Sequence, residues 1–266
     1  MLKYDINLEC IYTELPFEQR FAAAKKDGFD LIEIWGWADK DPAQVRALMD
    51  ENGQSMALLS CGDGPFSMCD PKEKADYLDY LERAVKAAKI MGAKVIGLHS
   101  DALQEWPQYA KPLSEDYSDI RKYCAMYDVL KEIAPMAESE DLIFTLEPLN
   151  TVQDHCGNFL DTTEKTAELI KAVGSSNIKI LYDAYHMYLN EGRICEITEK
   201  YLPLIQHIHI ADAPGRHEPG TGVIHYANYF KFLEEKGYGN TIGFELMPQE
   251  TSEKAMDAIK KAIGMD

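Results

Sequence analysis

The chain has 266 residues, of which 46% are hydrophobic, so it can bury a large core and does not have the composition of a disordered chain. Its formal net charge is −18, and such a surface repels nucleic-acid phosphates and anionic membranes. No stretch approaches the ~18 uninterrupted apolar residues of a membrane span. The first residues also lack the apolar core of a secretion signal, so we expect a cytoplasmic protein with neither a nucleic-acid nor a membrane partner.

Strand-like and helix-like segments alternate along the whole chain. The predicted strands cover residues 5–10, 31–35, 55–60, 94–99, 142–148, 178–183, 205–212 and 241–247. The predicted helices cover residues 16–29, 41–53, 70–91, 117–139, 163–173, 194–202, 226–236 and 253–263. Capping residues support these limits, since Asp41 and Pro42 begin the second helix and Gly53 ends it.

Eight strands that each precede a helix imply a parallel sheet with helical crossovers. Eight is also the number of strands that closes a barrel with a filled interior, and such barrels contain roughly 250 residues. A doubly wound open sheet would need a glycine-rich first turn, but residues 8–17 (LECIYTELPF) contain no glycine. No linker interrupts the chain, so we expect an α/β fold, a (β/α)₈ TIM barrel, as one domain over residues 1–266.

Four polar residues stand near the carboxyl ends of the last four predicted strands, and these are Glu147, Asp183, His209 and Glu245. Ligands and catalytic groups of a parallel barrel come from these ends. Buried carboxylates need a partner, and no Lys or Arg occurs on the same strand ends. One divalent cation would meet that need, and hydrogen bonds or salt bridges across the barrel mouth are the alternative. Three carboxylates and one imidazole suit Mn²⁺, Mg²⁺ or Co²⁺, with Zn²⁺ also compatible.

Further polar residues lie close to these strand ends and are candidates for substrate binding. His186 follows the sixth strand, Arg216 lies in the loop after the seventh, and His99 ends the fourth. His207 shares a strand face with His209 but lies one layer deeper. We therefore expect His207 to be a hydrogen-bonded core residue and not a ligand.

The chain resembles the xylose-isomerase-like barrels, a superfamily of sugar isomerases, ketose 3-epimerases and apurinic endonucleases, and within it the hydroxypyruvate isomerase branch. The resemblance rests on residues 7–34, LEPLN at 146–150, YDAYHM at 182–187, HIHIADAPGRHEPGTGVIHY at 207–226 and GYGNTIGFELMP at 237–248. It implies the same four metal ligands. It also implies that Glu147 and Glu245 form the catalytic acid/base pair, and that His186 and Arg216 hold substrate oxygens.

Three features of the chain leave the substrate open within this family. Some hydroxypyruvate isomerases carry glutamine where His209 stands, and the epimerases carry a second substrate-binding glutamate where Gln153 stands. Residues 34–41 (IWGWADKD) also differ from the corresponding stretch of hydroxypyruvate isomerases.

The expected reaction moves a proton next to a carbonyl through an enediolate. The predicted function is therefore an isomerase of a small hydroxy-oxo acid such as hydroxypyruvate, with a ketose 3-epimerase as the alternative. An apurinic endonuclease is disfavoured because Gly215 replaces the aspartate that precedes the Arg-His pair in those enzymes, and because the net charge opposes DNA. The expected partner is a small carbohydrate or hydroxy-oxo acid, and related barrels are often homo-oligomers.

Overall fold

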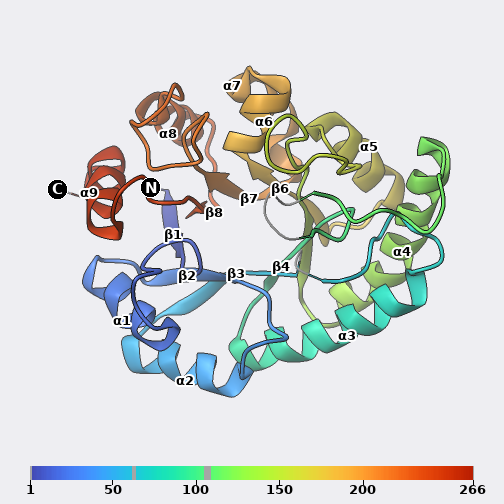
Figure 1. The fold of residues 1–266 in the computed structure, drawn as a ribbon, viewed down its shortest axis with the longest axis horizontal. Coiled ribbons are helices and arrows are strands. Elements are labelled where there is room, and N and C mark those ends of the chain that lie inside the picture. Colours follow the sequence, from blue (N-terminus) through green and yellow to red (C-terminus); the bar gives the residue numbers. More distant parts are fainter. Residues whose placement is uncertain (1, 62–63, 105–108, 266) are drawn as a thin grey trace.

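The computed structural model describes residues 2–61, 64–104 and 109–265. Eight parallel strands form a closed barrel in sequence order, with β8 pairing back onto β1, as Figure 1 shows. They are β1 (Lys3–Asn7), β2 (Leu31–Trp35), β3 (Ser55–Ser60), β4 (Val95–Leu98), β5 (Ile143–Leu146), β6 (Ile178–Asp183), β7 (Ile205–Ile210) and β8 (Thr241–Phe244). The predicted (β/α)₈ fold is thus confirmed.

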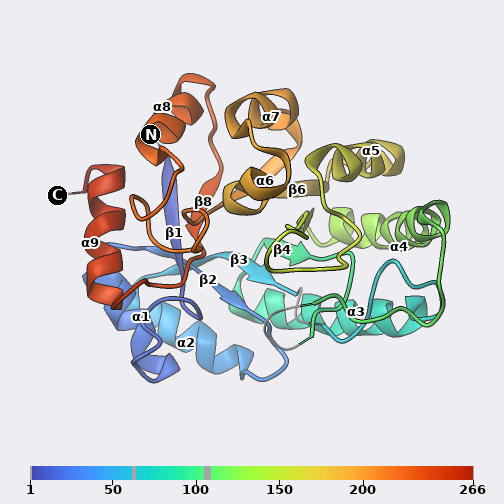
Figure 2. The same cartoon turned by 45° about the horizontal axis from the view of Figure 1, so that its top comes forward.

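Helices surround the strands on the outside of the barrel, as the views in Figures 1 and 2 both show. They are α1 (Phe17–Lys26), α2 (Pro42–Asn52), α3 (Lys74–Met91), α4 (Asp119–Ser139), α5 (Thr163–Val173), α6 (Ala184–Glu191), α7 (Ile194–Tyr201), the 3₁₀ helix η1 (Leu202–Leu204), α8 (Tyr226–Glu235) and α9 (Ser252–Ile263). The two ends of the chain meet where Ser252 Oγ accepts a hydrogen bond of 2.8 Å from the backbone N–H of Tyr12. None of the described helices is both long and apolar enough to span a membrane.

Local sequence signals account for the limits of several helices. The side chain of Asp41 accepts an N–H of the first turn of α2, and Gly53 ends that helix at a φ of 61°. Thr162 caps α5 in the same way, and Gly174 ends it at a φ of 78°. Oxygen-bearing side chains satisfy the free N–H groups at a helix start, and glycine adopts the left-handed conformation of a helix end without a Cβ clash.

Alternation along the strands places an apolar layer outside the barrel and a mixed set of side chains inside it. The inside includes an apolar cluster of Leu58, Val95 and Leu181 as well as polar groups. Phe244 of β8 packs edge-on against Phe29 and Phe230 outside the strands, with ring centroids 6.4 Å away in both cases. The opposite face of the strands sends charged side chains into the barrel, among them Glu33 and His209, whose facing atoms are 3.1 Å apart. Because successive side chains alternate, the same strands hold both the core and the candidate site.

One helix was not predicted from the sequence. The expected helix over residues 194–202 corresponds to α7, but α6 precedes it and begins directly after β6. Asp183 caps α6 by accepting the backbone N–H groups of Tyr185 and His186, and Gly192 follows its last residue. In the sequence, Asp183 was interpreted as a metal ligand at the end of a strand. The same residue is also the N-cap of α6, and the helix was missed for that reason.

Candidate active site

The four expected ligands lie together at the carboxyl rim of the barrel. Glu147 is the first residue after β5, Asp183 ends β6, His209 is on β7, and Glu245 is the first residue after β8. All four are buried, with Asp183 fully inaccessible. Neighbouring strands in sequence are neighbours in the barrel, so polar residues at equivalent heights on β5 to β8 converge.

Several side-chain atoms converge on one point of this rim. One ligand atom each of Glu147, Asp183, His186 and Glu245 lies within 4.8 Å of the others. His209 Nδ1 lies 3.4 Å from Glu147 Oε1 and 3.6 Å from Glu245 Oε2. Within the described part of the chain, Glu147 Oε1, Asp183 Oδ2 and His209 Nδ1 are buried without a hydrogen-bond partner. Oxygen and nitrogen atoms of this kind, buried at one rim and with His209 Nδ1 beside two of the carboxylates, fit the ligand set of a divalent cation.

The protonation equilibria of this cluster are strongly perturbed. Burial raises the pKa of Asp183 to about 7, and the Glu147 charge adds to the rise. Burial opposes ionisation of Glu147 too, but the nearby rings of His209 and His99 outweigh it and hold the pKa of Glu147 well below its usual range. The pKa of His209 is raised, because attraction to Glu33 and Glu245 outweighs the effect of burial. Without a cation, protons must balance the crowded carboxylates.

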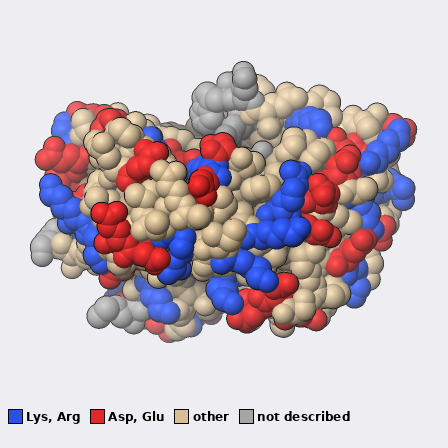
Figure 3. Space-filling view, turned by 90° about the horizontal axis from the view of Figure 1, so that it is seen from below, with Lys and Arg blue, Asp and Glu red and all other residues tan. Residues whose placement is uncertain are grey.

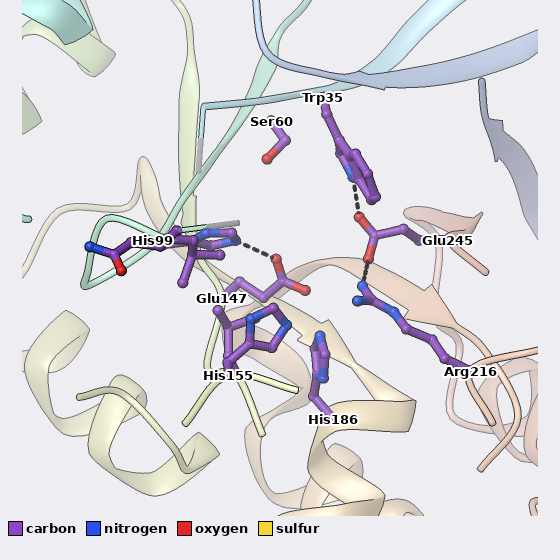
Figure 4. Close-up of a pocket in the computed structure, with 11 residues that line it drawn as sticks. Trp35, Ser60, His99, Glu147, His155, His186, Arg216 and Glu245 are labelled. Carbon is purple, nitrogen blue, oxygen red and sulfur yellow. Dashed lines mark hydrogen bonds and ion pairs between the residues drawn. The ribbon is translucent and has the colours of Figure 1, made fainter. Parts of the chain in front are cut away.

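Both oxygens of Glu245 already have side-chain partners. Trp35 Nε1 donates to Oε1 at 2.5 Å, and Arg216 Nη2 donates to Oε2 at 2.5 Å, as Figure 4 shows. Arg216 is buried and has a φ of 56°, a conformation that costs energy for a residue with a Cβ. No Lys or Arg stands on the strand ends themselves, as the sequence indicated. Arg216 comes instead from the loop after β7 and pairs with Glu245.

Glu147 faces Glu245 across the opening of the barrel and has a different set of partners. Its Oε2 lies 3.0 Å from His99 Nε2, while its Oε1 lies among the convergent atoms. His186 lies beside it, with Nε2 3.4 Å from Asp183 Oδ2 and Nδ1 2.6 Å from the amide of Asn150. All three expected substrate-binding residues therefore come to this site, with His186 close enough to the cluster to serve as a further ligand.

A cavity of about 150 Å³ opens beside the cluster. It is lined by Trp35, Ser60, His99, Leu103, Gln104, Glu147, Leu149, His155, His186, Arg216 and Glu245, most of which Figure 4 labels. This volume is below the roughly 300–1,000 Å³ of sites for drug-sized ligands, so it suits a molecule of few carbons. The predicted catalytic and substrate-binding residues all reach its wall, and their roles stay predictions.

His155 is the main lining residue that sequence reasoning missed. It lies in the loop after β5, is 2% exposed, and neither ring nitrogen has a hydrogen-bond partner among the described residues. Its ring stands edge-on to His186 with centroids 4.9 Å apart. Burial, aided by the Arg216 charge, lowers its pKa to about 3, so it is a neutral imidazole at physiological pH. In the sequence, His155 is notable only because it lies eight residues after Glu147. That position does not distinguish it from a surface histidine.

Two other sequence-based interpretations have clear structural outcomes. His207 is fully buried and bonded to Thr241 and Glu33, which confirms that it is a hydrogen-bonded core histidine. Gln153 uses its amide to bond Tyr185 Oη at 3.2 Å and the carbonyl of Pro214 at 2.8 Å. That amide therefore connects the loops after β5 and β7 and is not part of the cavity wall.

Comparison with known proteins places this arrangement in a family. The family model described as xylose isomerase-like TIM barrel matches residues 21–262. The chain belongs to this family. The 2-oxo-tetronate isomerase of Cupriavidus necator is 28% identical to this xylose isomerase-like barrel over 99% of the present chain and 100% of its own. The hydroxypyruvate isomerase of Escherichia coli is 29% identical, over 96% and 97% of the two chains.

A solved structure agrees with the family assignment at the level of the fold. The structure described as AP endonuclease, family 2, from Brucella melitensis matches this xylose isomerase-like barrel with a TM-score of 0.87 and 22% identity, covering 96% of this chain and 97% of that one. At such identity the likeness concerns the fold alone. The full-length relatives named as isomerases confirm the expected enzyme class, so the protein is an enzyme of the isomerase or epimerase type.

Proposed function

We propose that the protein is a divalent-metal-dependent isomerase that moves a proton next to the carbonyl of a small hydroxy-oxo acid. The observation that carries the proposal is the position of Glu147, Asp183, His209 and Glu245 beside a small cavity. Ligand atoms of Glu147, Asp183 and Glu245 lie within 4.8 Å of one another, and His209 Nδ1 lies 3.4 Å from Glu147 and 3.6 Å from Glu245. A cation bound by these four residues would polarise the substrate carbonyl and stabilise the negative charge of the enediolate. The relatives named for hydroxypyruvate and 2-oxo-tetronate support this class of substrate.

Glu147 and Glu245 are the proposed acid/base pair. Each has one oxygen near His209 Nδ1, which is Oε1 of Glu147 and Oε2 of Glu245. The other oxygen of each lies at a ring nitrogen, which is His99 Nε2 for Glu147 and Trp35 Nε1 for Glu245. These outer oxygens are the ones we assign to proton transfer, because a carboxylate that holds a cation through one oxygen keeps lone pairs on the other.

The remaining polar lining orients the substrate. Arg216 supplies the guanidinium charge on this wall, and the neutral rings of His155 and His186 supply hydrogen-bonding nitrogens. A carboxylate and two further oxygens on a three- or four-carbon chain can use such a set of donors without a large cavity. Leu103 and Leu149 also line this small cavity, whose volume favours a short chain over a longer sugar.

A ketose 3-epimerase is the second candidate. Two glutamates that face each other across the cavity, as in Figure 4, can act on opposite faces of one carbon, which is what epimerisation needs. The isomerase is preferred because relatives that match 99% and 96% of the chain are named as isomerases.

Proton exchange with solvent tests the proposal. The Mn²⁺-loaded protein is incubated in D₂O with hydroxypyruvate, with 2-oxo-tetronate and with free ketoses, and deuterium uptake and product formation are followed by mass spectrometry and by NMR after chelation. We expect uptake with a hydroxy-oxo acid, its loss on chelation, and a fall of about 10²–10⁴-fold in Glu147→Gln and in Glu245→Gln. The matched control Glu250→Gln, an exposed residue, should keep full activity. Exchange only with ketoses supports the epimerase, and exchange with none of these compounds contradicts both.

A further inference from the structure

A carboxylate below the proposed metal site joins two histidines inside the barrel. His207 Nε2 and His209 Nε2 each lie 3.1 Å from the same atom, Glu33 Oε2. All three residues are at most 1% exposed. An ionised carboxylate only accepts hydrogen bonds, so both ring nitrogens that face it must carry hydrogens.

This arrangement determines which nitrogen of His209 is available at the rim. A neutral imidazole has one N–H and one lone pair. If Nε2 carries the hydrogen that faces Glu33, Nδ1 carries the lone pair, and Nδ1 is the atom 3.4 Å from Glu147 Oε1. The opposite tautomer would direct a lone pair at the Glu33 carboxylate, which is repulsive, and would direct an N–H at the position of the cation.

The backbone is shaped to admit this carboxylate. The pairing of β2 with β3 shifts register between Ile32 and Glu33, and such irregularities re-aim side chains next to active sites. On the facing strand, a Cβ at Gly243 would lie only 2.7 Å from Glu33 Oε2 and 2.8 Å from His207 Nε2. Any larger residue at position 243 would therefore displace the network, so the glycine provides the space that the network occupies.

We propose that Glu33 is a positioning residue for the metal site, because its Oε2 holds the Nε2–H of His209 and thereby presents Nδ1 to the cation. The inference rests on the proposed function only for the presence of that cation. Carboxylates that orient ligating histidines typically contribute 10–100-fold to metal affinity. Glu33 would act from β2, which carries none of the four proposed ligands.

Metal affinity in three variants tests this role without reference to activity. Mn²⁺ binding is measured by titration calorimetry in Glu33→Met, Glu33→Gln and Thr241→Val. Methionine removes the acceptor, and we expect affinity to fall 10–100-fold. Glutamine keeps an acceptor oxygen and should recover part of that loss. Thr241→Val is the matched control, since it removes the 2.7 Å bond to His207 Nδ1 but leaves the bond between Glu33 and His209. Its affinity should stay within about threefold of wild type.

A measurement on the unmutated protein covers the case in which Glu33→Met does not fold. Histidine ¹⁵N NMR of the metal-free and Zn²⁺-loaded protein reports which ring nitrogen carries hydrogen, with the His209 signals assigned by their loss in His209→Gln. We expect a slowly exchanging Nε2–H in both states. A Zn²⁺-loaded His209 protonated at Nδ1, or Mn²⁺ affinity unchanged in Glu33→Met, overturns the role of Glu33 alone. If wild type binds no metal while the Nε2–H is present, it is the proposed metal-dependent function that fails, and the metal-directed part of this inference fails with it.

Discussion

His155 is a side chain of the cavity wall that can contribute a hydrogen bond to the substrate. Its two ring nitrogens are buried without a hydrogen-bond partner among the residues that the structure describes, and a buried polar group in that state costs free energy until something bonds to it. The ring lies beside His186 and on the cavity wall. A substrate oxygen would supply the missing hydrogen bond.

Replacing His155 by alanine should therefore weaken substrate binding more than it slows chemistry. The loss of one neutral hydrogen bond corresponds to about 0.5–1.5 kcal/mol, so we expect KM to rise about three- to tenfold with kcat little changed. Steady-state kinetics on the best substrate from the exchange experiment measures this. The control is His225→Asn, an exposed helix cap that asparagine can replace. A fall in kcat with unchanged KM would show that the ring acts in the chemical step.

Part of the site could be predicted from single residues and part could not. Glu147, Asp183, His209 and Glu245 were identifiable because each lies at or next to the end of a largely apolar strand, and parallel strands end at a common rim. Trp35 contacts Glu245 across 210 positions of sequence, and nothing in its neighbourhood signals that contact. Such pairings depend on the register of the closed barrel, which local patterns do not define.

At the scale of the secondary-structure elements, Asp183 is shared by the strand β6 and the helix α6. It ends β6, and its Oδ1 accepts the N–H groups of Tyr185 and His186 at 2.7 and 3.0 Å to begin α6. Its Oδ2 faces the convergent cluster, 3.4 Å from His186 Nε2. One carboxylate therefore fixes the helix start with one oxygen and offers the other to a cation.

Asp183→Asn removes the carboxylate charge but keeps a side chain that can cap α6, so its effect on the free energy of unfolding should depend on pH. In the metal-free protein the pKa of Asp183 is raised to about 7, against ~3.9 for an unfolded aspartate. The folded state binds this proton more tightly, so the Asp183 contribution to the free energy of unfolding falls as pH rises from ~4 to ~7. Asparagine keeps the helix cap and has no such dependence.

Urea unfolding of both metal-free proteins at pH 4.5 and 7.5 measures the difference. Relative to wild type, Asp183→Asn should be more stable at the higher pH than at the lower, while Mn²⁺ affinity falls at least about tenfold. Asp183→Ala lacks the cap and should be about 1 kcal/mol less stable than the asparagine variant at both pH values. A stability difference between wild type and Asp183→Asn that does not vary with pH would contradict the raised pKa.

Sequence patterns predicted the elements better than their ends. Strands β2, β3 and β6 and helix α5 have the predicted limits, whereas β5 and β8 end before Glu147 and Glu245. Residue pairing between β4 and β5 ends at Leu98 and Leu146, and that between β7 and β8 ends at Ile210 and Phe244. Alternation of apolar residues continues past that point, so the pattern alone extends the strand too far.

At the scale of the whole molecule, the cluster joins parts of the barrel that are far apart in the sequence. Its proposed ligands come from the ends of β5 to β8, and Trp35 and Glu33 connect it to β2. Closure of the ring adds contacts of the N-terminal region with α9, including the ion pair of Lys260 and Asp27 at 2.6 Å. A cation held at the rim would therefore stabilise the complete fold and not one loop.

Mn²⁺ should raise the melting temperature, but a chain with a net charge of −18 also attracts cations without a specific site. Figure 3 shows acidic and basic side chains interleaved over one face, which limits non-specific binding there without abolishing it elsewhere. At 100 times Kd, specific binding contributes about 2.7 kcal/mol, or about 5–10 °C for a chain of this size. Scanning calorimetry with and without chelator measures the shift. His209→Ala removes a proposed ligand that is only 1% exposed, so it keeps the surface charge and should lose most of the shift. An equal shift in both proteins would mean that the cation acts on the surface and not at the rim.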